Sequence, residues 1–211
     1  FFLRDGGYYF ALSDYIDLAV TGEIYTKGSW GLAAKSGYKK RYKYSGSFDA
    51  SYLVTKTGDK DLPDYSLSKD FQLRWSHTQD PKANPYLSFS ASVNFSTSSY
   101  DRNNQNSYYA QSGSYAAVNQ NTKSSSINIT KRFPNNPFTI SANMSINQIT
   151  RDSSIAVTLP NMTITMSRIF PFKRKHAVGK ERWYEKIAMS YSGTLSNSIT
   201  TKENKLFKSN L

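Results

Sequence analysis

The sequence offers few residues that could perform catalysis. It holds only two histidines, His77 and His176, and neither lies in a motif with a recognisable nucleophile. Serine is so abundant that a serine near either histidine carries no specific signal for a Ser-His hydrolase, which needs a defined geometry. We therefore expect no enzyme activity, no catalytic residue and no cofactor.

Three acidic residues, Asp59, Asp61 and Asp64, resemble a fragment of a calcium-binding loop. The glycine and the terminal glutamate of the full motif are missing, which favours a solvated acidic loop. Cysteine is absent, so disulfides and thiolate metal sites are excluded. The sequence predicts no metal site.

The strongest basic cluster lies in residues 172–182 and includes Lys173, Arg174 and Lys175, in a chain of formal net charge +12. Nucleic-acid binding is disfavoured because the aromatic residues lie on apolar strand faces and are not interleaved with the cations as a base-stacking platform. Phosphorylated lipid is the better predicted partner.

A second set of cations falls on predicted interior strand faces: Lys35, Lys39, Lys43 and Arg74. Together they would give the interior a positive potential and could contact lipid phosphate. For any one of these residues alone, solvation of a turn is the simpler explanation.

The elements that must position these residues are β-strands. Only 38% of the residues are hydrophobic, yet 15% are aromatic. Disordered chains are poor in aromatic residues, so disorder is disfavoured. No run of 18 apolar residues exists, so the only predicted way across a membrane is a closed barrel of strands.

Apolar residues alternate with Ser, Thr and Asn along most of the chain. The clearest runs are residues 42–55, where only Leu53 breaks the alternation, and residues 87–97. A membrane-crossing strand needs about 9–11 residues, whereas soluble strands are near 5–6. Aromatic residues near strand ends suit interfacial girdles: Tyr25, Trp30, Tyr42, Trp75, Tyr86 and Trp183. The pattern favours an all-β, antiparallel transmembrane β-barrel over a soluble β-sandwich.

The connections also sort by length. If residues 15–25 rise outward, the connections at 39–41, 78–85 and 132–137 face the periplasm, and the longer ones at 56–68 and 99–121 face outside.

Residues 153–168 are predicted to form one long strand. Their apolar positions change parity from Ile155, Val157 and Leu159 to Met162, Ile164 and Met166, as one extra residue in a β-bulge at Pro160 would produce. A last strand is expected at residues 183–195, which makes about nine strands. Single-chain bacterial barrels normally have an even number. We therefore expect an incomplete barrel wall, an internal piece of a longer protein.

Two segments resemble the start of the barrel in the LptD family of outer-membrane lipopolysaccharide-assembly proteins. They are residues 7–18, GYYFALSDYIDL, and residues 24–32, IYTKGSWGL. The resemblance continues through residues 46–52 and 71–80. It implies a location in the bacterial outer membrane, with residues 1–14 as the end of a periplasmic jellyroll or a lead-in and residues 15–211 as the first part of the barrel.

The resemblance also implies a function. Such proteins receive lipopolysaccharide from periplasmic bridge proteins and release it sideways, into the outer-membrane lipid, through a seam between the first and last strands. An LptE-like plug lipoprotein fills the lumen. The implied lateral-gate strand carries Tyr15, Asp17, Val20, Gly22 and Ile24. Gly22 stands in a strand where relatives often carry proline, and could loosen the pairing.

Two other functions remain open from the sequence. One is a porin or a TonB-dependent-type solute channel. The other is a surface adhesin or a soluble β-sandwich binding module.

Overall fold

The chain folds into a single antiparallel sheet of ten strands that are hydrogen-bonded in sequence order. The computed structural model describes residues 1–211 apart from 61–62, 104–121, 175–178, 203–204 and 206–211. The strands are β1 (Phe2–Ser13), β2 (Ile16–Tyr25), β3 (Trp30–Lys40), β4 (Tyr44–Thr57), β5 (Ser66–Gln79), β6 (Leu87–Ser96), β7 (Thr122–Arg132), β8 (Phe138–Ile149), β9 (Ser154–Ile169) and β10 (Met189–Lys202). Two short helices are α1 (Tyr100–Asn103) and η1 (Trp183–Lys186).

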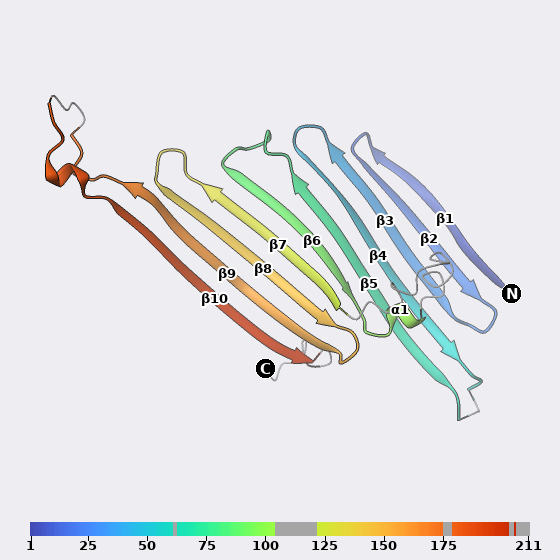
Figure 1. The fold of residues 1–211 in the computed structure, drawn as a ribbon. Helices are drawn as coiled ribbons and strands as arrows, with labels where there is room; N and C mark the ends of the chain where they lie inside the picture. Colours follow the sequence, from blue (N-terminus) through green and yellow to red (C-terminus); the bar gives the residue numbers. More distant parts are fainter. Residues whose placement is uncertain (61–62, 104–121, 175–178, 203–204, 206–211) are drawn as a thin grey trace, which may run out of the picture.

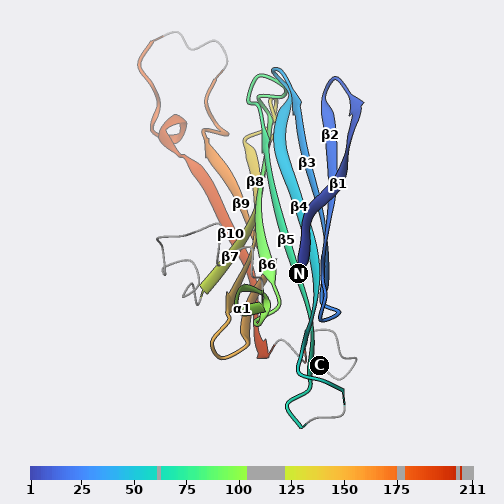
Figure 2. The same ribbon diagram turned by 90° about the vertical axis from the view of Figure 1, so that its right-hand side faces the viewer.

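The strands lie in one curved layer (Figures 1 and 2). A β-sandwich needs two sheets packed face to face, and the described residues form only one, so the sandwich alternative is wrong. The sheet is not closed, because β1 and β10 have no strand on their outer sides within the described residues. The prediction of an incomplete antiparallel barrel wall is confirmed.

Strand pairing confirms the alternation. Cross-strand partners put Leu32 beside Tyr52 and Tyr52 beside Phe71 on one face, and Lys35 beside Asp49 on the other. Few apolar side chains are buried: Leu53, Val54, Ala91, Tyr100 and Ile155. Most large apolar side chains are exposed on one side of the sheet, which is the arrangement that a lipid environment requires.

Leu53, the exception to the alternation, lies on the polar face. Its neighbour on that face, Ser51, is hydrogen-bonded to the Tyr100 hydroxyl of α1. Both Leu53 and Tyr100 are buried. The segment after β6 therefore folds back over the polar face of β4, and this cover explains an apolar residue there.

The strand count is ten, so the prediction of about nine is too low. The additional strand is β1, which pairs with β2 from Phe2–Tyr25 to Ser13–Ile16. Its alternation is hidden by Gly6 and Gly7 and by a bulge. The assignment of residues 1–14 to a jellyroll end or a barrel lead-in, and of residues 15–211 to the barrel, stays a prediction.

The predicted bulge in β9 is confirmed. Asn161 lies opposite Asn143 and Thr158 opposite Ser145, so Leu159 and Pro160 face the single residue Met144. The same shift appears against β10. The peptide bond between Leu159 and Pro160 is cis.

The last strand begins later than predicted. Trp183 lies in η1 and Ile187 caps it, so neither residue is in β10, which starts at Met189. Local ion pairing, described below, folds this segment into a turn in place of an extension of the strand.

The connections sort to the two ends as predicted. Those that join β3 to β4, β5 to β6 and β7 to β8 lie at one end, and those that leave β4 and β6 lie at the other (Figure 1). The assignment of these ends to periplasm and exterior stays a prediction. Among the described residues, no helix has both the length and the apolar character needed to span a membrane.

Candidate functional site

The polar face of the sheet carries its charges on the strands near β1. In register, Lys35 lies beside Asp49, and Asp49 lies beside Arg74. Lys39 lies on the same face, beside Ser45. Lys43 is not in a strand: it lies in the turn after β3, where its carbonyl accepts a hydrogen bond from the backbone of Asp80. The structure therefore brings Lys35 and Arg74 together around a carboxylate and separates Lys43 from them.

The other half of this face is built from uncharged groups. One row crosses the strands through Ser90, Asn128, Asn143, Asn161 and Ser196. The amide nitrogen of Asn143 donates to the Asn128 side-chain oxygen. Amide and hydroxyl side chains thus cover the face from β6 to β10 with little formal charge.

A buried carboxylate, Asp70, lies near the start of β5. Asp70 is 0% exposed and accepts hydrogen bonds from Ser68, Thr97, Ser99 and Asn103, among them 2.8 Å from Ser68 Oγ, 3.0 Å from Thr97 Oγ1 and 2.7 Å from Asn103 Nδ2. A buried charge is tolerated when its hydrogen-bonding capacity is filled. Asp70 therefore fixes the start of the connection after β6 against the polar face.

A second buried group links β6 to β7 and β8. Ser96 is 0% exposed, and its backbone carbonyl accepts a 2.6 Å hydrogen bond from the amide of Gln148. The Lys123 ammonium donates to the Ser96 hydroxyl. These contacts satisfy polar groups where β6 ends and the chain leaves the sheet.

The aromatic groups predicted for the girdles occupy several kinds of element. Trp30 begins β3 and Trp75 lies in β5, whereas Tyr42 and Tyr86 lie in turns and Trp183 lies in η1. Trp75 donates a 2.8 Å hydrogen bond to the Tyr38 hydroxyl, which also lies 2.9 Å from Nδ1 of His77. His77 is thus part of an aromatic cluster on the apolar face. His176 lies outside the described residues.

The predicted gate strand is β2, and the structure places it one strand in from the edge. Asp17, Val20, Gly22 and Ile24 lie in β2, which pairs with β1 on one side and β3 on the other. Tyr15 lies in the turn before it. The edge strand on this side, within the described residues, is β1.

Pairing between β1 and β2 is irregular. Ile24 lies opposite Leu3 and Gly22 opposite Gly6, so Arg4 and Asp5 face the single residue Glu23. This is a β-bulge, and Asp5 has φ 55°, a left-handed conformation that Asp tolerates better than most residues. Gly22, predicted to loosen pairing, thus lies next to a break in the ladder.

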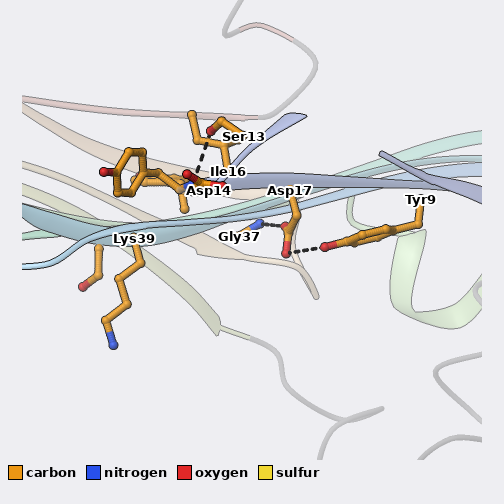
Figure 3. A pocket seen from close by; sticks show the side chains of 11 residues that line it. Tyr9, Ser13, Asp14, Ile16, Asp17, Gly37 and Lys39 are labelled. Atoms are coloured by element: carbon orange, nitrogen blue, oxygen red, sulfur yellow. Dashed lines mark hydrogen bonds between the residues drawn. The ribbon is translucent and has the colours of Figure 1, made fainter. Parts of the chain in front are cut away.

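Pairing between β2 and β3 is interrupted at Asp17. The carboxylate accepts a 2.6 Å hydrogen bond from the Gly37 backbone, and the Asp17 carbonyl accepts a 2.7 Å bond from Ser36 Oγ. Side-chain bonds replace two ladder bonds there. The Tyr9 hydroxyl reaches the other carboxylate oxygen at 3.4 Å (Figure 3).

A hollow of about 450 Å³ opens beside Asp17, at the end of β1 to β4. Its lining comes from the turn after β1 and from the polar-face side chains Tyr9, Asp17, Lys39 and Ser45. In Figure 3 the Asp17 and Lys39 side chains extend from the same side of the sheet. The hollow therefore combines an aromatic ring, a carboxylate, an ammonium and a hydroxyl.

Two cations of the basic cluster after β9, Lys173 and Arg174, are paired with carboxylates of the same connection. Arg174 Nε lies 2.5 Å from Glu185 Oε1, and Arg174 Nη2 lies 3.3 Å from Glu185 Oε2. Lys173 forms an exposed 3.7 Å ion pair with Glu181. Lys175 lies outside the described residues. The predicted contacts of Lys173 and Arg174 with lipid phosphate would have to compete with these carboxylates.

Glu185 is the centre of this connection. The Arg174 guanidinium and the 2.8 Å hydrogen bond from the Arg182 backbone lower the pKa of Glu185 to about 2. Because the folded pKa is below the ordinary value of 4.5, the ionised carboxylate stabilises the connection fully above about pH 4.5. That stabilisation is lost as the pH falls toward 2.

We expect Glu185→Gln to loosen residues 170–174 and 179–188. The neutral amide cannot replace a charged, bidentate partner of Arg174. Hydrogen exchange on the full-length protein in detergent, corrected for the intrinsic amide rate at each pH, should show reduced protection of this connection in the variant at pH 7 and in wild type as the pH approaches 2. Glu181→Gln is the control, since its ion pair is exposed and should matter little. Equal exchange in both variants would contradict the assignment.

Sequence reasoning missed Tyr9, Asp70, Gln148 and Glu185. Tyr9 could have been found from the sequence. If residues 8–10 form a strand, Tyr8 and Phe10 lie on one face and Tyr9 lies on the opposite face. The other three are defined by partners elsewhere in the chain. Among the described residues, no group of three or more His, Cys, Asp or Glu side chains could hold a metal.

These features define a class of protein. The sheet has long antiparallel strands, one apolar and one polar face, and two open edges, and this combination is the wall of an outer-membrane β-barrel. Residues 1–211 match the family described as LptD protein. The chain belongs to this family of outer-membrane lipopolysaccharide-transport proteins. No curated protein sequence matches it.

Proposed function

We propose that this chain forms the part of a barrel wall beside a lateral opening, through which lipopolysaccharide enters the outer leaflet. The observation that carries the proposal is the weakly paired edge. The bulge at Arg4 and Asp5 disturbs the ladder between β1 and β2, whereas β3, β4 and β5 pair without a register shift. β1 is thus an edge strand whose pairing to the wall is disturbed, and we assign the opening to its outer side, where no strand pairs with it among the described residues.

The proposal assigns the edge of the opening to β1 and uses β2 as its support. Asp17, Val20, Gly22 and Ile24 then act through their pairing with β1. Lipopolysaccharide would arrive from periplasmic bridge proteins, and a plug lipoprotein would face the polar side of the wall. Lys35, Lys39 and Arg74 on that side, with the turn residue Lys43, would supply positive charge toward phosphate groups.

A depletion and complementation experiment tests both the function and the position of the opening. Cells depleted of the full-length protein should lose newly made lipopolysaccharide from their surface, and the wild-type gene should restore it. A Tyr8→Cys/Val20→Cys variant should also restore it, in both reduced and oxidised states. These positions are direct partners in β1 and β2, at a separation that a disulfide can span.

The outcomes separate the alternatives. Unchanged surface lipopolysaccharide after depletion, with failed uptake of a solute, would overturn the function in favour of a solute channel. Complementation that is lost only after oxidation would place the opening between β1 and β2 and contradict the assignment to the outer side of β1. The chain has no cysteine of its own, so the added pair is the only one within it.

A further inference from the structure

The hollow beside Asp17 has the side chains that bind a sugar ring. Tyr9 is 60% exposed although it lies within a strand, so its ring is available for contact. The hollow is open on the polar side of the sheet and lies at the edge formed by β1 (Figure 3). A ligand on that side could enter without displacing a strand.

Hydrogen-bonding groups in the hollow are held in place. Asp17 Oδ1 is fixed by the Gly37 backbone at 2.6 Å, while Asp17 Oδ2 has, within the described part of the chain, only the long 3.4 Å contact with the Tyr9 hydroxyl. That second oxygen can accept a bond from a ligand hydroxyl. Ser45 and Lys39 add a hydroxyl and an ammonium across the hollow.

This combination fits a pyranose better than other ligands. Aromatic rings offer a flat apolar surface with a polar edge, which suits the C–H face of a sugar, and a fixed carboxylate accepts two or more sugar hydroxyls. A phosphate group would meet the carboxylates of Asp14 and Asp17, and only Lys39 would oppose them. An apolar acyl chain would remove water from Lys39 and from Asp17 Oδ2 and would offer them no hydrogen bonds in exchange.

We propose that the hollow formed by Tyr9, Asp17, Lys39 and Ser45 is a binding site for an uncharged sugar residue of a glycolipid. The proposal rests on the proposed function, because it identifies the saccharide part of the transported lipid as the part that contacts β1. Tyr9 provides the stacking surface. Asp17 provides the acceptor that orients the ring.

The experiment uses the full-length protein in detergent and two probes, namely the lipid-free oligosaccharide released from the cells' lipopolysaccharide by mild acid and the lipid A left behind. Binding is measured by titration calorimetry. Tyr9→Ala should weaken oligosaccharide binding about tenfold, the size expected for loss of one aromatic contact. Tyr9→Phe should retain the affinity within about twofold, since the ring remains.

Tyr8→Ala is the matched control. Tyr8 is the adjacent residue, is similarly exposed at 68% and points to the opposite face, so its loss should leave oligosaccharide binding unchanged. Lipid A binding should not respond to any of the three variants. This pattern would support the sugar site.

Several results would overturn the sugar site. They are wild-type affinity in Tyr9→Ala, equal weakening in Tyr8→Ala, no binding of the oligosaccharide, or a Tyr9→Ala effect on lipid A. Failure of the proposed function gives a different result, because depletion would then leave surface lipopolysaccharide unchanged, whether or not Tyr9→Ala alters oligosaccharide binding. If depletion removes surface lipopolysaccharide and Tyr9→Ala binds normally, only the sugar site is wrong.

Discussion

Gly7→Ala should separate β1 from β2 and abolish most delivery of lipopolysaccharide to the cell surface. A Cβ atom at this position would lie 2.1 Å from the Val20 carbonyl oxygen and 2.7 Å from the Thr21 Cα. Both atoms belong to the backbone of β2, so a side-chain rotation cannot relieve the clash. We expect a destabilisation of about 1–3 kcal/mol, the range for overpacking, concentrated in the edge strand.

Gly6→Ala, in the same strand, is the control for this variant. Its added Cβ would meet the Leu3 side chain at 3.9 Å and the Gly22 carbonyl oxygen at 4.0 Å, which are ordinary contacts. Thermal unfolding of the full-length protein in detergent and surface lipopolysaccharide in complemented cells should change with Gly7→Ala and stay near wild type with Gly6→Ala. Similar behaviour of the two variants would show that the close approach of Gly7 to the β2 backbone is not needed to keep β1 paired with β2.

The second large effect is expected from Asp70→Ala. The substitution leaves the donors of Ser68, Thr97, Ser99 and Asn103 without their common acceptor. Hydrogen bonds to a charged group contribute about 1.5–3 kcal/mol each, although water can replace some of them. We expect a loss of about 3 kcal/mol in the free energy of unfolding, together with release of residues 97–103 from the wall.

Thermal unfolding and protease cleavage within residues 97–103 measure the two parts of this effect. Asp49→Ala is the matched control, because Asp49 is a carboxylate on the same face but is not fully buried. Its loss should cost about 1 kcal/mol or less. If Asp70→Ala and Asp49→Ala unfold alike and resist cleavage alike, Asp70 does not anchor the segment.

The regular strands were predictable because their information is local. In residues 42–55 the polarity of nearly every side chain indicates the face of the sheet on which it lies. The change of alternation around Pro160 is likewise visible within a single strand. The bulge in β9 could therefore be placed before any partner strand was known. Pairing in sequence order then follows from the short connections.

The missed strand β1 and the misplaced start of β10 lie where side-chain polarity does not indicate the structure. Gly6 and Gly7 have no side chain to indicate a face, and the bulge at Arg4 shifts the alternation, so β1 was not recognised as a strand. Trp183 and Ile187 continue an apolar spacing, but the ion pair between Arg174 and Glu185 folds the segment. A salt bridge across a connection leaves no periodic signal.

The candidate site was predictable only in part. The polarity pattern put Lys35, Lys39 and Arg74 on one face, which the register confirms. The pairing of Asp17 with Gly37 joins residues 20 positions apart, and Asp70 collects donors as many as 33 positions away. Such contacts depend on which strands become neighbours.

The open edges have a consequence for biogenesis. β1 and β10 each present one row of backbone N–H and C=O groups with no partner strand among the described residues, and unpaired edges are templates for association with other chains. In a nascent polypeptide these two rows would recruit any extended segment nearby. Insertion of the wall must therefore be timed with the arrival of the strands that flank it, or a chaperone must shield both edges until then.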